Sequence, residues 1–201
     1  MVLATKNNIA QVYASEERYG EAISLFETVI REYRENSTED SAFLATVYDN
    51  LSTAYREMER YEDAIDICTE GLNIRKDIYG KRSLDYAISL NNLALIYYEM
   101  GILNDAADIF SEALAIKKET LPEIHGQISI GYFNLGLVYD KLHRDNEALE
   151  NYRASMEIDN ELEAYEDVLL TAEYIAEIYE RNDMPEDAEA YRTLCSKDDV
   201  H

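Results

Sequence analysis

The sequence predicts an all-α fold, a solenoid of about five helix-turn-helix units with ten helices in 201 residues. One short pattern, an apolar run that ends in tyrosine, recurs with a step of 42 residues three times and then of 40. The five tyrosines are Tyr13, Tyr55, Tyr97, Tyr139 and Tyr179. An alanine stands nine residues after each of them, at Ala22, Ala64, Ala106, Ala148 and Ala188. Only 2 prolines and 7 glycines are present, which leaves little room for long loops or many short strands.

The apolar residues recur three and four positions apart, which is the spacing of amphipathic helices. Ile9, Val12 and Tyr13 illustrate this spacing, and we expect them to share one buried stripe. The predicted helices span residues 3–15, 19–33, 41–58, 61–79, 83–100, 104–120, 126–142, 145–158, 163–181 and 185–195.

Local signals set the helix boundaries. Residues 36–41 read as a turn followed by a helix start, because Ser, Thr and Asp accept hydrogen bonds from the first N–H groups of a helix. Gly80 and Gly101 suit helix C-termini, and Pro122 stops the helix before it. His125 is expected at a helix start, and Pro185 fits a first turn, where its missing N–H costs nothing. Residues 196–201 are expected to fray.

Small and bulky positions alternate along the repeat. The alanine column and a second small column allow the two helices of a unit to approach closely; the second column is Ala10, Ser52, Ala94, Gly136 and Ala176. The tyrosine column should fill the space between helices, together with Phe26, Cys68, Phe110 and Tyr152. We therefore interpret these tyrosines as core residues rather than as a stacking platform for a cofactor.

The small–large alternation, the Tyr and the Ala nine residues later resemble the tetratricopeptide repeat (TPR). Three features resemble the kinesin light chain subtype: the 42-residue step, the segment Leu-Asn-Asn-Leu-Ala at 90–94, and His125 eight residues before Phe133. The resemblance implies a right-handed superhelix and a single domain over residues 1–201. Its repeats would span about 3–38, 39–80, 81–122, 123–162 and 163–197.

The same resemblance implies a peptide-binding groove lined by the first helix of each unit. The residue before the central Leu or Ile would face this groove, and that column reads Asn8, Asn50, Asn92, Asn134 and then Tyr174. An Asn amide both donates and accepts hydrogen bonds, so it could clamp a peptide backbone. Alternatively, these amides bond to the adjacent helix and set the helix spacing. Further groove positions are Asn7, Asp49, Asn91, Phe133, Leu95, Leu137, Arg56, Tyr98 and Lys141.

The formal net charge of −24 argues against nucleic acid and anionic membrane as partners, because both are bound first through Lys and Arg. Acid is densest from Asp145 to Glu189, where 16 carboxylates face 2 arginines. This region is either a solvated, solubilising face or a surface for a basic partner. Cys68 and Cys195 lack framework spacing, and no signal or membrane segment is visible, so we expect a cytoplasmic protein.

No catalytic motif or metal-ligand pattern is visible, so the sequence predicts a non-enzyme without cofactors. We expect a protein-interaction scaffold or adaptor that binds an extended peptide, preferably one with Lys or Arg beside apolar anchors. The alternatives are a structural module that self-associates through its end helices, or a peptide-sensing regulatory domain of a larger protein.

Overall fold

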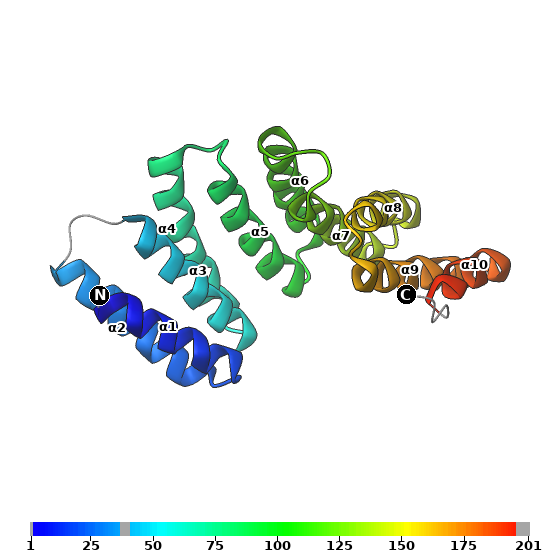
Figure 1. The fold of residues 1–201 in the computed structure, drawn as a ribbon. Helices are drawn as coiled ribbons and strands as arrows, with labels where there is room; N and C mark the ends of the chain where they lie inside the picture. The colour runs from blue at the N-terminus through cyan, green and yellow to red at the C-terminus, as the bar shows by residue number, and fades with distance from the viewer. Residues whose placement is uncertain (1, 37–40, 196–201) are drawn as a thin grey trace. The chain divides into compact units, whose positions relative to one another are not determined.

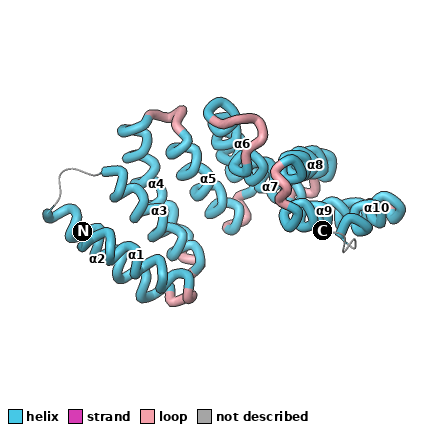
Figure 2. Tube along the Cα trace, in the orientation of Figure 1, coloured by secondary structure: helices cyan, strands magenta, loops and turns pink. Residues whose placement is uncertain are grey.

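The computed structural model describes residues 2–36 and 41–195, and all regular elements in these ranges are α-helices (Figures 1 and 2). They are α1 (Val2–Ser15), α2 (Tyr19–Asn36), α3 (Ser41–Glu57), α4 (Tyr61–Tyr79), α5 (Leu84–Glu99), α6 (Leu103–Thr120), α7 (Gly126–Lys141), α8 (Asp145–Glu161), α9 (Tyr165–Arg181) and α10 (Pro185–Cys195). The predicted all-α helical-repeat class is confirmed. The turn expected within 36–41 and the end expected to fray at 196–201 fall mostly or wholly outside the described residues.

The helices group into two compact units, which divide between Ile102 and Leu103. In the first unit, consecutive helices pack against one another from α1 to α5, and α3 also contacts α1 and α5. In the second unit, consecutive helices pack from α6 to α10. We refer to the odd-numbered helices as A helices and to the even-numbered ones as B helices.

Every A helix ends in the same way, at a residue with left-handed backbone geometry. These residues are Glu17 (φ 60°), Glu59 (φ 56°), Gly101 (φ 77°), His143 (φ 56°) and Asp183 (φ 58°). The next residue donates its backbone N–H to the carbonyl of the repeat tyrosine, as Arg18 does to Tyr13 at 2.9 Å. This is the Schellman arrangement, which satisfies helix carbonyls that would otherwise lack partners. It gives all five A–B turns one length and so keeps the tyrosine and alanine columns in phase.

The repeat tyrosines are less buried than expected, apart from Tyr55. Tyr13, Tyr97, Tyr139 and Tyr179 are half-buried. In three repeats an arginine from the A–B turn covers the ring. Arg18 lies 4.2 Å from the Tyr13 centroid, Arg60 lies 4.4 Å from that of Tyr55, and Arg144 lies 4.6 Å from that of Tyr139. The column is therefore a boundary between core and solvent, held partly by cation–π contacts.

The alanine column is fully buried, as predicted, at Ala22, Ala64, Ala106, Ala148 and Ala188. The second small column adjusts to the B-helix residue that faces it. Gly136 on α7 faces Tyr152 on α8, and a Cβ at Gly136 would lie only 2.5 Å from the Tyr152 ring. The large ring at 152 therefore requires a glycine, whereas Ser52 suffices where the facing residue is Cys68.

The prediction that Ile9 and Val12 are buried is wrong. Ile9 is 43% exposed and Val12 is 53% exposed. Within the described residues α1 packs mainly against α2, with fewer contacts to α3, and Leu3, Tyr13 and Ala14 rather than Ile9 and Val12 pack against the core. The helical spacing identified an apolar stripe correctly, but a terminal helix has a neighbour on fewer sides.

Candidate functional site

The candidate site is the asparagine face, the side of the A helices of the first unit that carries Asn8, Asn50 and Asn92; Asn134 holds the same repeat position in the second unit. In the first unit Asn8 is exposed, and Asn50, Arg56, Asn91, Asn92, Leu95 and Tyr98 are half-buried. In the second unit Lys141 is exposed, Phe133 and Leu137 are half-buried, and Asn134 is buried. The expected groove positions Asn7 and Asp49 are also buried, at 6% and 7% exposure, so they support this face from beneath.

Two asparagines of the first unit, Asn50 and Asn92, bind to the neighbouring A helix. Asn50 donates from Nδ2 to Oδ1 of Asn7 at 3.3 Å, which joins α3 to α1. Asn92 donates to the carboxylate of Asp49, which joins α5 to α3. In both cases the acceptor occupies the position just before the asparagine of the preceding repeat. These contacts favour the second interpretation of the column, in which the amides set the spacing of the helices.

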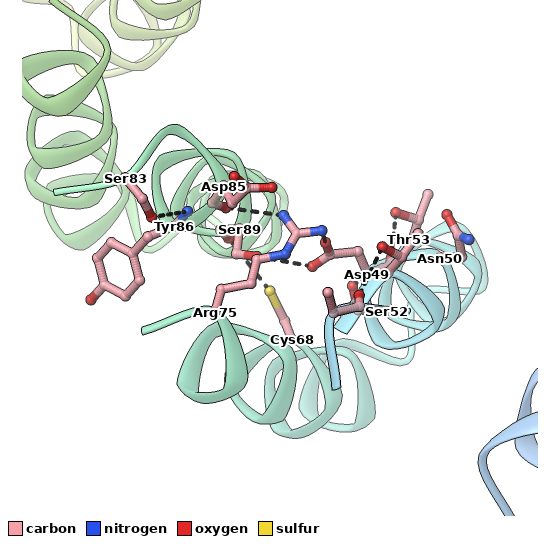
Figure 3. A network of polar contacts seen from close by, with 12 residues as sticks. Asp49, Asn50, Ser52, Thr53, Cys68, Arg75, Ser83, Asp85, Tyr86 and Ser89 are labelled. Atoms are coloured by element: carbon pink, nitrogen blue, oxygen red, sulfur yellow. Dashed lines mark hydrogen bonds and ion pairs between the residues drawn. The ribbon is translucent and has the colours of Figure 1, made fainter. Parts of the chain in front are cut away.

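Beneath Asn92 lies a buried polar network at the junction of α3, α4 and α5. Figure 3 shows Arg75 reaching from α4 to Asp49 on α3 and to the backbone of Asp85. Arg75 Nη2 lies 2.6 Å from Asp49 Oδ2, and Nη1 donates to the Asp85 carbonyl at 3.0 Å. Ser89 donates its hydroxyl to Asp49 Oδ1 at 3.2 Å, and Cys68 donates to the Ser89 carbonyl at 3.7 Å.

Burial controls the ionisation of this network. Removal from water raises the pKa of Asp49, although Arg75 and the hydrogen bonds from Ser89 and Asn92 act in the opposite direction. Burial likewise raises the pKa of the Cys68 thiol to about 12, so this cysteine is a packed, unreactive group. The network is structural, and through Asp49 it holds the Asn92 amide in place.

Ion pairs connect neighbouring A helices near their C-terminal ends. In the first unit Arg56 pairs with Glu57 and, at 3.4 Å, with Glu99 on α5. In the second unit Arg181 on α9 pairs with Asp140 on α7 and with Asp145 on α8. Glu99 and Arg181 occupy the same position of the repeat, so the pair is kept with its charges reversed. Because Arg56 is neutralised by two carboxylates, it adds little positive charge to the face.

In the second unit an aromatic cluster replaces the asparagine pattern. The ring of Tyr174, at the position that breaks the column, lies 5.4 Å from both Phe133 and Tyr152, and Phe133 lies 5.6 Å from Tyr152. Leu137 packs against the same core. Phe133 and Leu137 are therefore largely occupied by internal packing, which leaves the first unit as the more accessible part of the predicted site.

The sequence interpretation missed the Asp49–Arg75 pair. The signal that could have found it is a column of charged residues on the B helices, at Arg75, Lys117 and Asp159, where the repeat otherwise places core side chains. All three are less than 9% exposed.

The part of the chain that the structure describes contains no group of His, Cys, Asp and Glu side chains suited to hold a metal ion. None of its helices combines the length and apolar character needed to cross a bilayer.

Comparison with known proteins agrees with the repeat architecture. A tetratricopeptide repeat family model matches residues 1–77 and 54–119, and a second one matches residues 131–162. No curated protein sequence matches the chain.

Solved structures with a similar fold share little sequence with the chain. The crystal structure of BtubC (BKLC) from P. vanneervenii has a TM-score of 0.84 at 20% identity, over 96% of this chain and 79% of that one. A kinesin light chain-like array of nearly identical TPR-like repeats from Podosopora anserina has a TM-score of 0.82 at 18% identity, over 99% and 97%. The Rap conjugation gene regulator of plasmid pLS20, in complex with the Phr* peptide, has a TM-score of 0.72 at 20% identity over 92% of this chain. This chain covers 50% of that regulator.

Proposed function

The chain belongs to the tetratricopeptide repeat family, and we propose that it is a non-enzymatic interaction module that binds an extended segment of a partner protein on its asparagine face. The family fold supports a role in protein–protein interaction. The structurally similar Rap regulator is in complex with a peptide. Neither comparison names a partner for this chain, so the binding mode rests on its own residues.

The observation that carries the proposal is the orientation of the amides in the first unit. Each amide has two N–H groups and one carbonyl, and the contacts to Asn7 and Asp49 use one N–H of Asn50 and of Asn92. A side chain held in this way loses little conformational entropy when its other N–H and its carbonyl bind a peptide backbone. The structural role and the binding role of the column are therefore compatible.

Leu95 and Tyr98 supply an apolar contact on the same face. Both are half-buried on α5, in the same unit as Asn50 and Asn92. The charge of −24 favours a peptide with Lys or Arg beside its apolar residues.

The free, buried thiol of Cys68 supports a reducing compartment, the cytoplasm, and fractionation of the host cell would test this location.

The test starts from linear peptides selected on the intact chain from a random display library. The double variant Asn8→Ala/Asn50→Ala is expected to bind the selected peptides about tenfold more weakly, because it removes two amides of the face. Leu95→Ser should weaken them further. We prefer this pair to Asn92 and Asn134, because Asn92 contacts the buried Asp49 and Asn134 is itself buried. Fluorescence polarisation gives the affinities.

Asn73→Ala is the matched control, since Asn73 is exposed on the B helix α4. It should leave the affinity unchanged, and the double variant should remain folded, with its melting temperature lowered only by the loss of the Asn50–Asn7 hydrogen bond. Equal binding by the double variant and the control would contradict the proposal, as would selection of peptides that lack Lys and Arg.

A second candidate function is self-association through an end helix. The exposed Val2, Ile9 and Val12 on α1 favour it, because exposed apolar residues grouped on one helix are typical of interaction surfaces. This candidate predicts a molar mass that rises with concentration in light scattering, and a monomer at all concentrations for Val12→Lys. A wild-type chain that is monomeric at all concentrations would contradict it.

A further inference from the structure

A second polar site lies within the second unit. A cavity of about 190 Å³ opens between the start of α7, the end of α8 and the start of α9. Its polar lining consists of Ser129, Ser155, Asp159, Asp167 and Thr171. We refer to it as the Asp159 cavity. Its volume equals about six water molecules, which is the size of one long side chain.

Asp159 is the unusual residue of this cavity. It is 5% exposed, and its carboxylate accepts a hydrogen bond from the hydroxyl of Ser155 at 3.3 Å; the Ser129 hydroxyl lies 2.9 Å from that of Ser155. Within residues 2–36 and 41–195, no Lys, Arg or His forms an ion pair with it. Burial raises the pKa of Asp159, which is the expected response of a carboxylate that lacks a cation. A buried carboxylate of this kind gains from a positive partner more than an exposed one does.

The repeat register shows which cation this space can hold. Asp159 occupies the position that Arg75 occupies two repeats earlier, and Asp167 occupies that of Asp85. In the first unit the Arg75 guanidinium lies between the Asp49 carboxylate and the Asp85 carbonyl. Three residues that line the Asp159 cavity, Phe133, Asp167 and Thr171, stand at the positions of Asp49, Asp85 and Ser89 in the network of Arg75. The cavity is thus the space that an arginine side chain fills in the earlier unit.

The buried carboxylate also lies on a different helix in the later repeat. Asp49 of the A helix corresponds to Phe133, which packs in the aromatic cluster, so the carboxylate now comes from the B helix at Asp159. The earlier repeat contains both members of the pair, whereas in the later repeat Asp159 forms no ion pair with a described residue. The exposed apolar residues Ile130, Leu162 and Leu170 line the cavity and can contact the aliphatic stem of an entering side chain.

We propose that the Asp159 cavity binds an arginine side chain of a partner protein. The planar guanidinium can bond to Asp159 while its stem covers the apolar residues, and the surrounding segment 145–189 carries 16 carboxylates against 2 arginines. Arginine is preferred over lysine because Arg75 bonds at once to a carboxylate and to a backbone carbonyl, which its planar guanidinium allows. This site does not depend on peptide binding at the asparagine face.

The probe is N-acetyl-arginine methylamide, and its neutral control is N-acetyl-citrulline methylamide, which has nearly the same shape without the charge. Titration of the isotope-labelled full chain, followed by backbone amide chemical shifts, measures both affinities. We expect saturable shifts at Ser129, Ser155 and Thr171 with the arginine probe. The citrulline probe should bind at least about tenfold more weakly.

Variants separate the charge of Asp159 from the cavity itself. Asp159→Asn should bind both probes alike, at the level of the citrulline probe, whereas Asp187→Asn, an exposed acid on α10, should behave as wild type. Asp159→Arg should place its own guanidinium in the cavity, remain folded and show no shifts with either probe. If Asp159→Asn fails to fold, Asp159→Arg and the citrulline control still decide.

Equal affinity of the wild type for the two probes would overturn the proposal, as would binding by Asp159→Asn at wild-type strength or no localised shifts at all. A failure here would leave peptide binding at the asparagine face unaffected, because the variants of that test lie in the first unit.

Discussion

Arg75→Met is expected to lower the free energy of unfolding of the first unit by about 3–5 kcal/mol, because it leaves the Asp49 carboxylate buried without its cation. The side chains of Arg75 and Asp49 are only 9% and 10% exposed, so water cannot replace the lost partner. The measurement is urea unfolding followed by circular dichroism. Asp49→Asn in the same background should recover part of the loss, because it removes the unpaired charge.

The pH dependence gives a second readout of Arg75→Met. Without Arg75 the folded-state pKa of Asp49, already raised by burial, should rise further above its value in the unfolded chain. The folded state then holds more protons than the unfolded state, so stability falls as the pH rises through this interval. The variant should therefore come closest to the wild type in acid and lose most stability at neutral pH.

Arg60→Met is the control for Arg75→Met. Arg60 pairs with Asp63 at 2.7 Å, but both side chains are about half exposed, at 47% and 51%. Surface pairs of this kind contribute little, and the cation–π contact of Arg60 with Tyr55 adds about 0.5–1 kcal/mol, so the loss of stability should stay well below that of Arg75→Met. If Arg75→Met is no more destabilising than Arg60→Met, the buried network does not support the first unit.

Tyr152→Ala is expected to cost the second unit about 3–5 kcal/mol, the range for deleting a buried aromatic ring. Tyr152 is fully buried on α8, and it contacts the rings of Phe133 on α7 and Tyr174 on α9. Its loss leaves a cavity where three helices meet. Hydrogen exchange should show the loss of protection concentrated in α7, α8 and α9. Tyr165→Ala, with 46% exposure, is the control and should have a much smaller effect.

Gly136→Ala tests the same contact from the opposite side. Alone it should cost about 1–3 kcal/mol, because the new Cβ would lie 2.5 Å from the Tyr152 ring. In the Tyr152→Ala background it should cost nothing further, since the ring is gone. A simple sum of the two single effects would show that Gly136 and Tyr152 do not depend on each other.

Much of the fold follows from local sequence. The helix α4 and the helix α10 have the predicted bounds, and His125 caps α7 by accepting a hydrogen bond from the Gln127 N–H. Gly80 and Gly101 have positive φ, as expected at helix ends. The helix α8 runs to Glu161, three residues beyond the prediction, because Leu162 and Glu163 close it with backbone hydrogen bonds that no side-chain signal marks.

The candidate site was less predictable. The sequence placed Asn8, Asn50, Asn92 and Asn134 in one column, and it left open whether their amides face a ligand or the adjacent helix. In the first unit both bonds with a known partner go to the adjacent helix, at Asn7 and Asp49. Hydrogen-bond partners more than 40 residues apart depend on the distance between helices, and no local pattern encodes that distance.

By itself, the sequence determined the repeat length, the A and B helices and the small residues that let them meet, because helix periodicity, caps and side-chain volume act over a few residues. Only the tertiary structure decided that Arg75 pairs with Asp49, that Tyr174 joins an aromatic cluster and that Asp159 lines a cavity. Each of these results depends on how a charged or bulky side chain is surrounded by other helices. A buried aspartate that is paired with a cation, as Asp49 is with Arg75, has a structural role. Asp159 is buried but forms no ion pair with a described residue, so it is available to a partner.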